Sequence, residues 1–264
     1  MDVSKISACT IPLHDRALGE ALDIISDAGF KNIDLLARLP HFSIDPKECD
    51  HDAIERMVAE RGMQIANLGT YEGSSFVSES EAEREAGLVN LRNAIDLAAR
   101  FGARSIRITP GRPESPALFD RIVPYFQRGA EYAESKGIYM GIENHGGPIS
   151  GNPEALVDLC NRVGSRRFGV LYEPANLMAA GVEYKSAFEI MRCCIVHIHI
   201  KDGKYVEGKW RGTMLGQGEI NLKWIVNSLE SINYDGFIAL EYEVNQIEPP
   251  ETGLKKWYTV VEKI

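Results

Sequence analysis

The segment SKGIYMGIENHGG (residues 135–147) contains one complete example of the pattern on which this chain is built. Gly137 closes a stretch with helical spacing, and glycine readily adopts the left-handed conformation that ends a helix. A short apolar run over residues 138–143 follows and is typical of a buried strand. The run ends in the carboxylate of Glu143, and the amide of Asn144 and the imidazole of His145 follow. A strand buried in a core does not normally carry such groups at its end. The segment therefore predicts a helix, a strand and a polar cluster at the carboxyl end of that strand.

The same alternation recurs along the whole chain. Eight short apolar or β-branched runs are predicted as strands: residues 5–8, 32–35, 64–68, 105–109, 138–143, 168–172, 196–200 and 237–241. Segments whose apolar residues recur every three or four positions are predicted as helices: residues 17–28, 52–61, 79–101, 119–136, 153–163, 184–192, 222–231 and 254–261. Strands that alternate with helices pair in parallel through right-handed crossovers. Eight such units in 264 residues predict an α/β fold, with a single (β/α)8 barrel domain over residues 1–264.

An open doubly wound sheet is the alternative arrangement of such units. It would usually carry a glycine-rich phosphate-binding turn after its first strand. Residues 7–12 read SACTIP and contain no glycine. The pattern therefore favours the barrel.

Composition limits the classes of partner. The formal net charge is −9 and the isoelectric point is about 5.3, so the surface repels phosphate backbones and a nucleic-acid partner is not expected. The five cysteines are scattered without a C-x-x-C pair, which argues against a disulfide framework and favours a reducing cytoplasm. The N-terminal segment lacks the apolar core of a signal peptide, and no apolar run is long enough to predict a membrane span.

Functional groups in a (β/α)8 barrel collect at the carboxyl ends of the strands. Four consecutive predicted strands each deliver a metal-competent group to that edge, namely Glu143, Glu173, His199 and Glu241. Carboxylates left together in one cleft would repel one another, and one divalent cation removes that penalty. The mixed oxygen and nitrogen set suits Mn²⁺, Mg²⁺ or Co²⁺, with Zn²⁺ as a further option.

Each of these residues also has a plain structural interpretation. A glutamate at a strand end can cap a helix or form half of a salt bridge, and asparagines such as Asn176 are common in turns. His197 lies one layer deeper than His199 on the same face, and we expect it to be a core residue. Lys201 and Asp202 could form an ion pair at a turn or contact a substrate.

The chain resembles the sugar isomerase/epimerase superfamily with xylose isomerase-like barrels, which also contains relatives of endonuclease IV. The segments that carry the resemblance are GIENHGG (141–147), GVLYEPANLMAAG (169–181), IVHIHIKDG (195–203), LGQGEINLKWIVNSL (215–229) and YDGFIALEYE (234–243). In the ketose 3-epimerase branch, groups at the positions of Glu143, Glu173, His199 and Glu241 hold one divalent metal. The first and last of them also form the acid/base pair.

The chain departs from that branch at two positions. Glu173 replaces the usual aspartate, and Asn176 replaces a histidine that often follows it. The arginine that grips the far end of the sugar in those epimerases has no clear match. The expected substrate contacts are therefore His145, Asn176, Lys201, Asp202 and Arg211.

The resemblance implies proton transfer next to the carbonyl of a small keto-sugar or polyol, with the metal as Lewis acid. The first expectation is a metal-dependent isomerase or epimerase. A dehydratase of the same fold, like the inosose dehydratase-like branch, is the second. A nuclease like endonuclease IV and a non-catalytic binding barrel are further alternatives, and the chain is also compatible with a homo-oligomer.

Overall fold

The strands form a closed parallel barrel, as the alternating pattern predicted. The computed structural model describes residues 2–264. Around the barrel the strands follow the order β1-β10-β7-β6-β5-β4-β3-β2. Their bounds are β1 (Ile6–Cys9), β2 (Asn32–Leu36), β3 (Gln64–Glu72), β4 (Ser105–Ile108), β5 (Tyr139–Glu143), β6 (Phe168–Tyr172), β7 (Ile195–Ile200) and β10 (Ile238–Leu240). The remaining two strands, β8 (Asp202–Val206) and β9 (Lys209–Thr213), pair with each other as an antiparallel hairpin.

Helices follow the strands and flank the barrel. Their bounds are α1 (Leu18–Asp27), α2 (His51–Glu60), α3 (Glu81–Arg100), α4 (Phe119–Lys136), α5 (Pro153–Val163), α6 (Pro174–Ala179), α7 (Tyr184–Met191), α8 (Leu222–Ser231) and α9 (Pro250–Val261). Short 3-10 turns cover Val3–Lys5, Ile11–Leu13, Ser74–Val77 and Pro116–Leu118. Many helices begin at a side chain that caps the first turn, such as Ser80 before α3 and Asn221 before α8. None of the helices in residues 2–264 combines the length and the apolar character needed to cross a membrane.

By its internal contacts the chain divides into two compact units. One comprises the chain up to Ala66 together with His199–Ile264, and the other comprises Asn67–Ile198. The prediction of a single domain over residues 1–264 stays a prediction, and each unit is described by itself.

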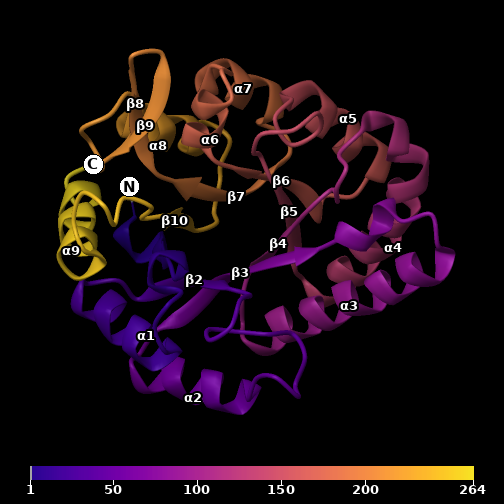
Figure 1. The fold of residues 1–264 in the computed structure, drawn as a ribbon, viewed down its shortest axis with the longest axis horizontal. Coiled ribbons are helices and arrows are strands. Elements are labelled where there is room, and N and C mark those ends of the chain that lie inside the picture. Colours follow the sequence, from indigo (N-terminus) through magenta and orange to yellow (C-terminus); the bar gives the residue numbers. More distant parts are fainter. Residues whose placement is uncertain (1) are drawn as a thin grey trace. The chain divides into compact units, whose positions relative to one another are not determined.

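The first unit joins the two ends of the chain through parallel strands. β1 pairs with β10, with Ile6 opposite Ile238, and with β2, with Cys9 opposite Asp34. Helix α1 packs against α9 and α2. The β8–β9 hairpin projects beside α8 (Figure 1).

The second unit is a run of parallel strands covered by packed helices. β4, β5 and β6 pair in sequence, and Gly141 of β5 lies opposite Arg107 of β4 and Gly169 of β6. Helix α3 packs along α4, and α4 packs against α5 (Figure 1). A Cβ at Gly169 would lie 2.0 Å from the carbonyl oxygen of Cys194, so this close strand contact requires glycine.

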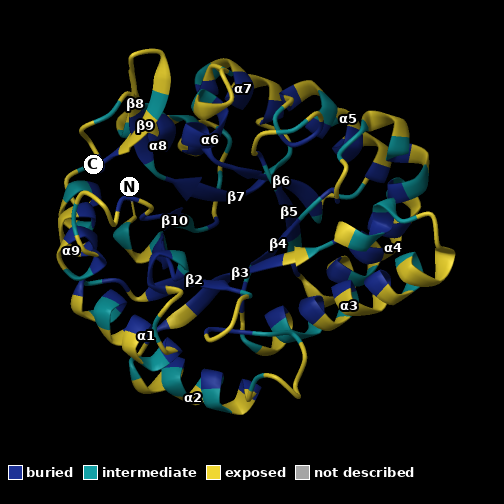
Figure 2. Ribbon diagram, viewed as in Figure 1, coloured by how far each residue is buried: buried dark blue, intermediate teal, exposed yellow. Residues whose placement is uncertain are grey.

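The strands are buried almost throughout, and the helices are buried on one face only (Figure 2). Every residue of β1, β2, β4 and β6 is buried. Strands covered on both faces are read in the sequence as continuous apolar runs, which explains why the strands could be located from the sequence.

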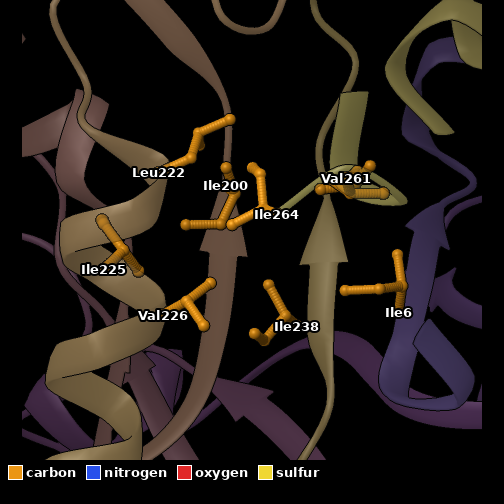
Figure 3. A pocket seen from close by; sticks show the side chains of 9 residues that line it. Ile6, Ile200, Leu222, Ile225, Val226, Ile238, Val261 and Ile264 are labelled. Atoms are coloured by element: carbon orange, nitrogen blue, oxygen red, sulfur yellow. The ribbon is translucent and has the colours of Figure 1, made fainter. Parts of the chain in front are cut away.

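One apolar layer of the first unit lies between α8 and the strands β1, β7 and β10. Figure 3 shows Ile200, Ile225, Val226 and Ile238 pointing toward a common small space. Its volume is about 20 Å³, and its lining consists of Ile6, Ile200, Leu222, Ile225, Val226, Ile238, Leu240, Val261 and Ile264. A cavity that can hold a water must also offer it hydrogen-bond partners. This one offers only aliphatic side chains, and it belongs to the core.

Candidate active site

The first cluster of polar side chains joins the ends of β7 and β10 in the first unit. The backbone N–H of Glu241 donates to the Ile200 carbonyl at 2.9 Å, which fixes Glu241 beside the end of β7. His199 and Glu241 are only 2% and 3% exposed. His199 Nδ1 lies 3.7 Å from Glu241 Oε1, which is too long for a direct hydrogen bond. The predicted rim residues of these two strands are therefore neighbours in the structure.

Lys201 neutralises the acids of this cluster. Its Nζ donates to Glu241 Oε2 at 2.8 Å and to Glu243 Oε2 at 2.7 Å. Burial of Glu241 favours the neutral acid, but the Lys201 ammonium and the His199 imidazole outweigh it and hold the pKa of Glu241 well below its ordinary value. Glu241 is therefore an ionised carboxylate at neutral pH.

Glu241 uses its two oxygens differently. Oε2 accepts from Lys201, and Oε1 faces the His199 ring. Two ligand atoms held at about 2.1 Å from a metal in a tetrahedral arrangement lie about 3.4 Å apart. The separation of 3.7 Å between Oε1 and Nδ1 is close to that value. The donor chemistry and the spacing of this pair fit a divalent cation.

Two residues of this cluster were missed by the sequence reasoning. Asp34 of β2 lies with Oδ2 2.9 Å from His199 Nε2, and Cys9 of β1 lies with Sγ 3.9 Å from the same nitrogen. One ligand atom each from Cys9, Asp34 and His199 lies within 4.8 Å of the others. Burial opposes a charged imidazole, but Cys9 and Asp34 outweigh it and hold the pKa of His199 well above its ordinary value. The available signal was an acid inside the apolar run of residues 32–35.

In the second unit, polar side chains gather around Glu143, the last residue of β5. Arg107 Nη1 donates to Glu143 Oε2 at 3.0 Å, and Asn176 Nδ2 donates to Glu143 Oε1 at 3.4 Å. Arg107 comes from β4, and its Nε donates to the Thr70 carbonyl at 3.2 Å. Its guanidinium lies 4.5 Å from the centre of the Tyr71 ring. The sequence reasoning missed Arg107 because a single arginine in an apolar strand does not reveal its partner.

Glu173 is fully buried and caps helix α6. Its Oε1 accepts from the Ala175 N–H at 2.9 Å, and its Oε2 accepts from the Asn176 N–H. Asn144 fixes its backbone, because Asn144 Oδ1 accepts from the Glu173 N–H at 2.8 Å and Asn144 Nδ2 donates to the Glu173 carbonyl at 2.7 Å. This is the cap that the plain interpretation anticipated, and a metal contact by Glu173 stays a prediction.

The residues expected to contact substrate lie in different settings. Asn176 is buried between Glu143 and the Asn144 carbonyl, to which it donates at 3.2 Å. His145 is exposed on the loop after β5, and its Nδ1 accepts from the Gly146 N–H at 2.8 Å. Arg211 is exposed on β9, at the hairpin position paired with Lys204.

Asp202 has a structural role in the first unit. It is buried, and its carboxylate accepts hydrogen bonds from the backbone N–H groups of Gly203, Gly216, Gly218 and Ile220. These contacts tie the base of the β8–β9 hairpin to the loop before α8. The Lys201–Asp202 ion pair weighed from the sequence is replaced by the pairs of Lys201 with Glu241 and Glu243.

A further titrating group lies at the end of β3. Burial raises the pKa of Glu72 to about 7. The sequence reasoning missed it because the predicted strand ended at residue 68, whereas β3 runs on to Glu72. All five cysteines carry free thiols, in agreement with the prediction that the chain has no disulfide framework.

Comparison with known proteins places this geometry in a family. One solved structure is a xylose isomerase-like TIM barrel protein from Mycobacterium smegmatis in complex with magnesium. It is 17% identical, with a TM-score of 0.80, and the match covers 98% of this chain and 97% of that one. The D-allulose 3-epimerase from Methylomonas sp., solved with D-allulose, is 17% identical with a TM-score of 0.75, covering 98% and 96%.

The probable 3-DHS dehydratase AsbF from Bacillus anthracis is 18% identical with a TM-score of 0.78, covering 98% of each chain. At these identities the structures share the fold alone. The sequence pattern of the xylose isomerase-like TIM barrel family matches residues 22–260. The chain belongs to the xylose isomerase-like TIM barrel family.

Proposed function

We propose that the protein is a divalent-metal-dependent isomerase or epimerase of a small keto-sugar or polyol. The observation that carries this proposal is the buried pair of His199 and Glu241, whose facing atoms lie 3.7 Å apart at adjacent strand ends. Family membership supports it, since a D-allulose 3-epimerase and a dehydratase have the same fold.

The proposed cation site combines His199 and Glu241 with Glu143, and with Glu173 as a fourth ligand. β5, β6, β7 and β10 are consecutive in the barrel order, so parallel pairing brings their carboxyl ends to one edge. Carboxylate and imidazole groups of this kind could hold a divalent ion. Each oxygen of Glu173 already accepts one hydrogen bond from the α6 backbone, so we expect it to be the weakest of the four ligands.

Glu143 and Glu241 are the proposed acid/base pair. One carboxylate removes the carbon-bound proton next to the substrate carbonyl, and the other returns a proton to the opposite face or to the neighbouring carbon. A bound cation would supply electrophilic stabilisation of the negative charge that develops on the carbonyl oxygen. Each carboxylate has a cationic neighbour, Lys201 for Glu241 and Arg107 for Glu143. The lowered pKa of Glu241 keeps that carboxylate ionised at neutral pH.

A dehydratase is the second candidate. The observation that favours it is the partly buried Lys201–Glu241 pair, because a lysine that contacts the base could deliver a proton to a leaving hydroxyl group. The chemistry begins with the same proton abstraction, and it ends with loss of the β-hydroxyl as water. The similarity in fold to the probable dehydratase AsbF accords with this outcome as well as with epimerisation.

The experiment is a panel of keto-sugars and inososes incubated with the protein and Mn²⁺, Mg²⁺, Co²⁺ or Zn²⁺ in D₂O, followed by proton NMR. Deuterium incorporation with a new epimer or isomer would support the first proposal. Loss of water from a substrate would support the dehydratase. A protein that binds no divalent ion and exchanges no substrate proton would contradict both, and would leave the non-catalytic binding barrel.

A further inference from the structure

The His199 ring lies between two different acids of the first unit. Its Nε2 lies 2.9 Å from Asp34 Oδ2, and its Nδ1 lies 3.7 Å from Glu241 Oε1. The first distance is a hydrogen bond, and the second is not. The two ring nitrogens therefore have separate tasks, and the structure indicates which nitrogen has which.

We propose that Asp34 is a positioning residue, which fixes Nε2 of His199 as the protonated nitrogen and directs the lone pair of Nδ1 to the cation. This inference rests on the proposed function. An ionised carboxylate can only accept hydrogen bonds, so the ring nitrogen that faces it must carry a proton. A nitrogen that binds a metal needs its lone pair, so Nε2 cannot do both. The cation is left with Nδ1, on the side of Glu241, and its binding releases the proton on Nδ1 to solvent.

Asp34 is well placed to hold the ring because its own position is fixed. It lies in the middle of β2 and is buried. β2 pairs with β1 through Cys9 opposite Asp34, and the Thr10 N–H donates to the Asp34 carbonyl at 3.0 Å. A carboxylate held on a rigid strand orients its imidazole partner more closely than one on a loop.

Cys9 offers a competing arrangement. Its Sγ lies 3.9 Å from Nε2, so a thiophilic ion could bind Cys9, Asp34 and Nε2 on the far side of the ring from Glu241. Thiolate ligands suit softer ions than Mn²⁺ or Mg²⁺, which disfavours this set for those two cations. The two arrangements use opposite ring nitrogens, and this makes them distinguishable by experiment.

The decisive variant is Asp34→Asn. The amide keeps the shape of the side chain, but its NH₂ group can donate to Nε2 and stabilise the tautomer with the proton on Nδ1, which cannot bind metal. Loss of such an outer partner typically costs about 10- to 100-fold in metal affinity. We expect Mn²⁺ affinity, measured by calorimetry, to fall by that factor. The matched control is Cys9→Ala, which removes the other neighbour of Nε2 and should change affinity by less than about threefold.

A spectroscopic measurement on the wild-type protein makes the test independent of how the variant folds. In ¹⁵N-histidine-labelled protein loaded with Zn²⁺, the His199 signals are identified by their absence in His199→Gln. We expect Nε2 to retain its proton and Nδ1 to be the metal-bound nitrogen.

Metal bound at Nε2, or a folded Asp34→Asn variant with wild-type Mn²⁺ affinity, would overturn the role of Asp34 while leaving the proposed function intact. A wild-type protein that binds no divalent ion would instead overturn the proposed function, and this inference with it.

Discussion

The ion pair between Lys201 and Glu241 allows a sharp test of the electrostatics of the site. Lys201→Met keeps most of the aliphatic stem and removes the ammonium that lies 2.8 Å from Glu241 Oε2. The Lys201 and Glu241 side chains are 16% and 4% exposed. At an effective dielectric constant of about 20, a pair at that separation attracts by about 6 kcal/mol, and the desolvation cost of the pair reduces the net contribution. Removing one partner of a buried pair costs about 3–5 kcal/mol.

We expect the lower end of that range, about 3 kcal/mol in the free energy of unfolding at pH 7 without metal, because Lys201 also pairs with the more exposed Glu243. With saturating Mn²⁺ the loss should fall to about half, because the cation then supplies the countercharge for Glu241. The assay is urea denaturation with EDTA and with Mn²⁺. The matched control is Lys204→Met at an exposed position of β8, which should stay within about 0.5 kcal/mol of wild type.

The pH dependence of this loss has a definite sign. The pKa of Glu241 is held well below its ordinary value of 4.5. A group with a lowered pKa in the folded state stabilises the protein above its ordinary pKa, and this contribution is lost as the pH falls through the lowered value. The difference between wild type and Lys201→Met should therefore be constant above about pH 5 and shrink below it. A loss of less than about 0.5 kcal/mol at pH 7, or the same loss with EDTA and with Mn²⁺, would refute the reasoning.

Three further predictions concern single side chains. With metal occupancy verified, Glu143→Gln and Glu241→Gln should each reduce turnover about 10²- to 10⁴-fold. The control Glu243→Gln should leave turnover unchanged. If both site variants still exchanged the substrate proton with D₂O at the wild-type rate, proton transfer would belong to another residue. Glu173→Gln should lower the free energy of unfolding by about 1–2 kcal/mol, because it weakens the cap of α6. It should also weaken Mn²⁺ binding, and extra Mn²⁺ should partly restore that binding. Unchanged stability would contradict the role of Glu173 as a cap. His197→Gln should lower the melting temperature with little change in metal affinity, and the reverse result would exchange the roles assigned to the two β7 histidines.

The fold was predictable because burial on both faces leaves a strong sequence signal. The predicted helices over residues 119–136, 153–163 and 222–231 agree with α4, α5 and α8 at both ends. β3 continues four residues past its predicted end because the polar Thr70 and Glu72 broke the apolar pattern while parallel pairing with β4 continued. The β8–β9 hairpin was missed because most of its residues are exposed and its position depends on the Asp202 contacts.

The candidate site was predictable in part, and the limit has a physical cause. Residues at strand ends could be proposed from the sequence because barrel geometry brings those ends to one edge, and His199 and Glu241 are neighbours in the structure. Their partners could not be found in this way. Asp34 and Arg107 contact residues more than thirty positions away in the sequence, which local patterns do not record. The side chain of Glu173 bonds its own helix, and a sequence pattern does not specify which way a carboxylate turns.

The central claim is that one divalent cation is held by Glu143, His199 and Glu241, with Glu173 as the weakest ligand. The most direct measurement is a crystal structure of the protein soaked in Mn²⁺, with the ion located by its anomalous signal. We expect one ion with carboxylate oxygens from Glu143 and Glu241 at about 2.0–2.4 Å and with His199 Nδ1 as the nitrogen ligand. An ion elsewhere, or these side chains more than about 8 Å apart with no ion between them, would contradict the account, since all of the ligands must lie within about 2.5 Å of one metal.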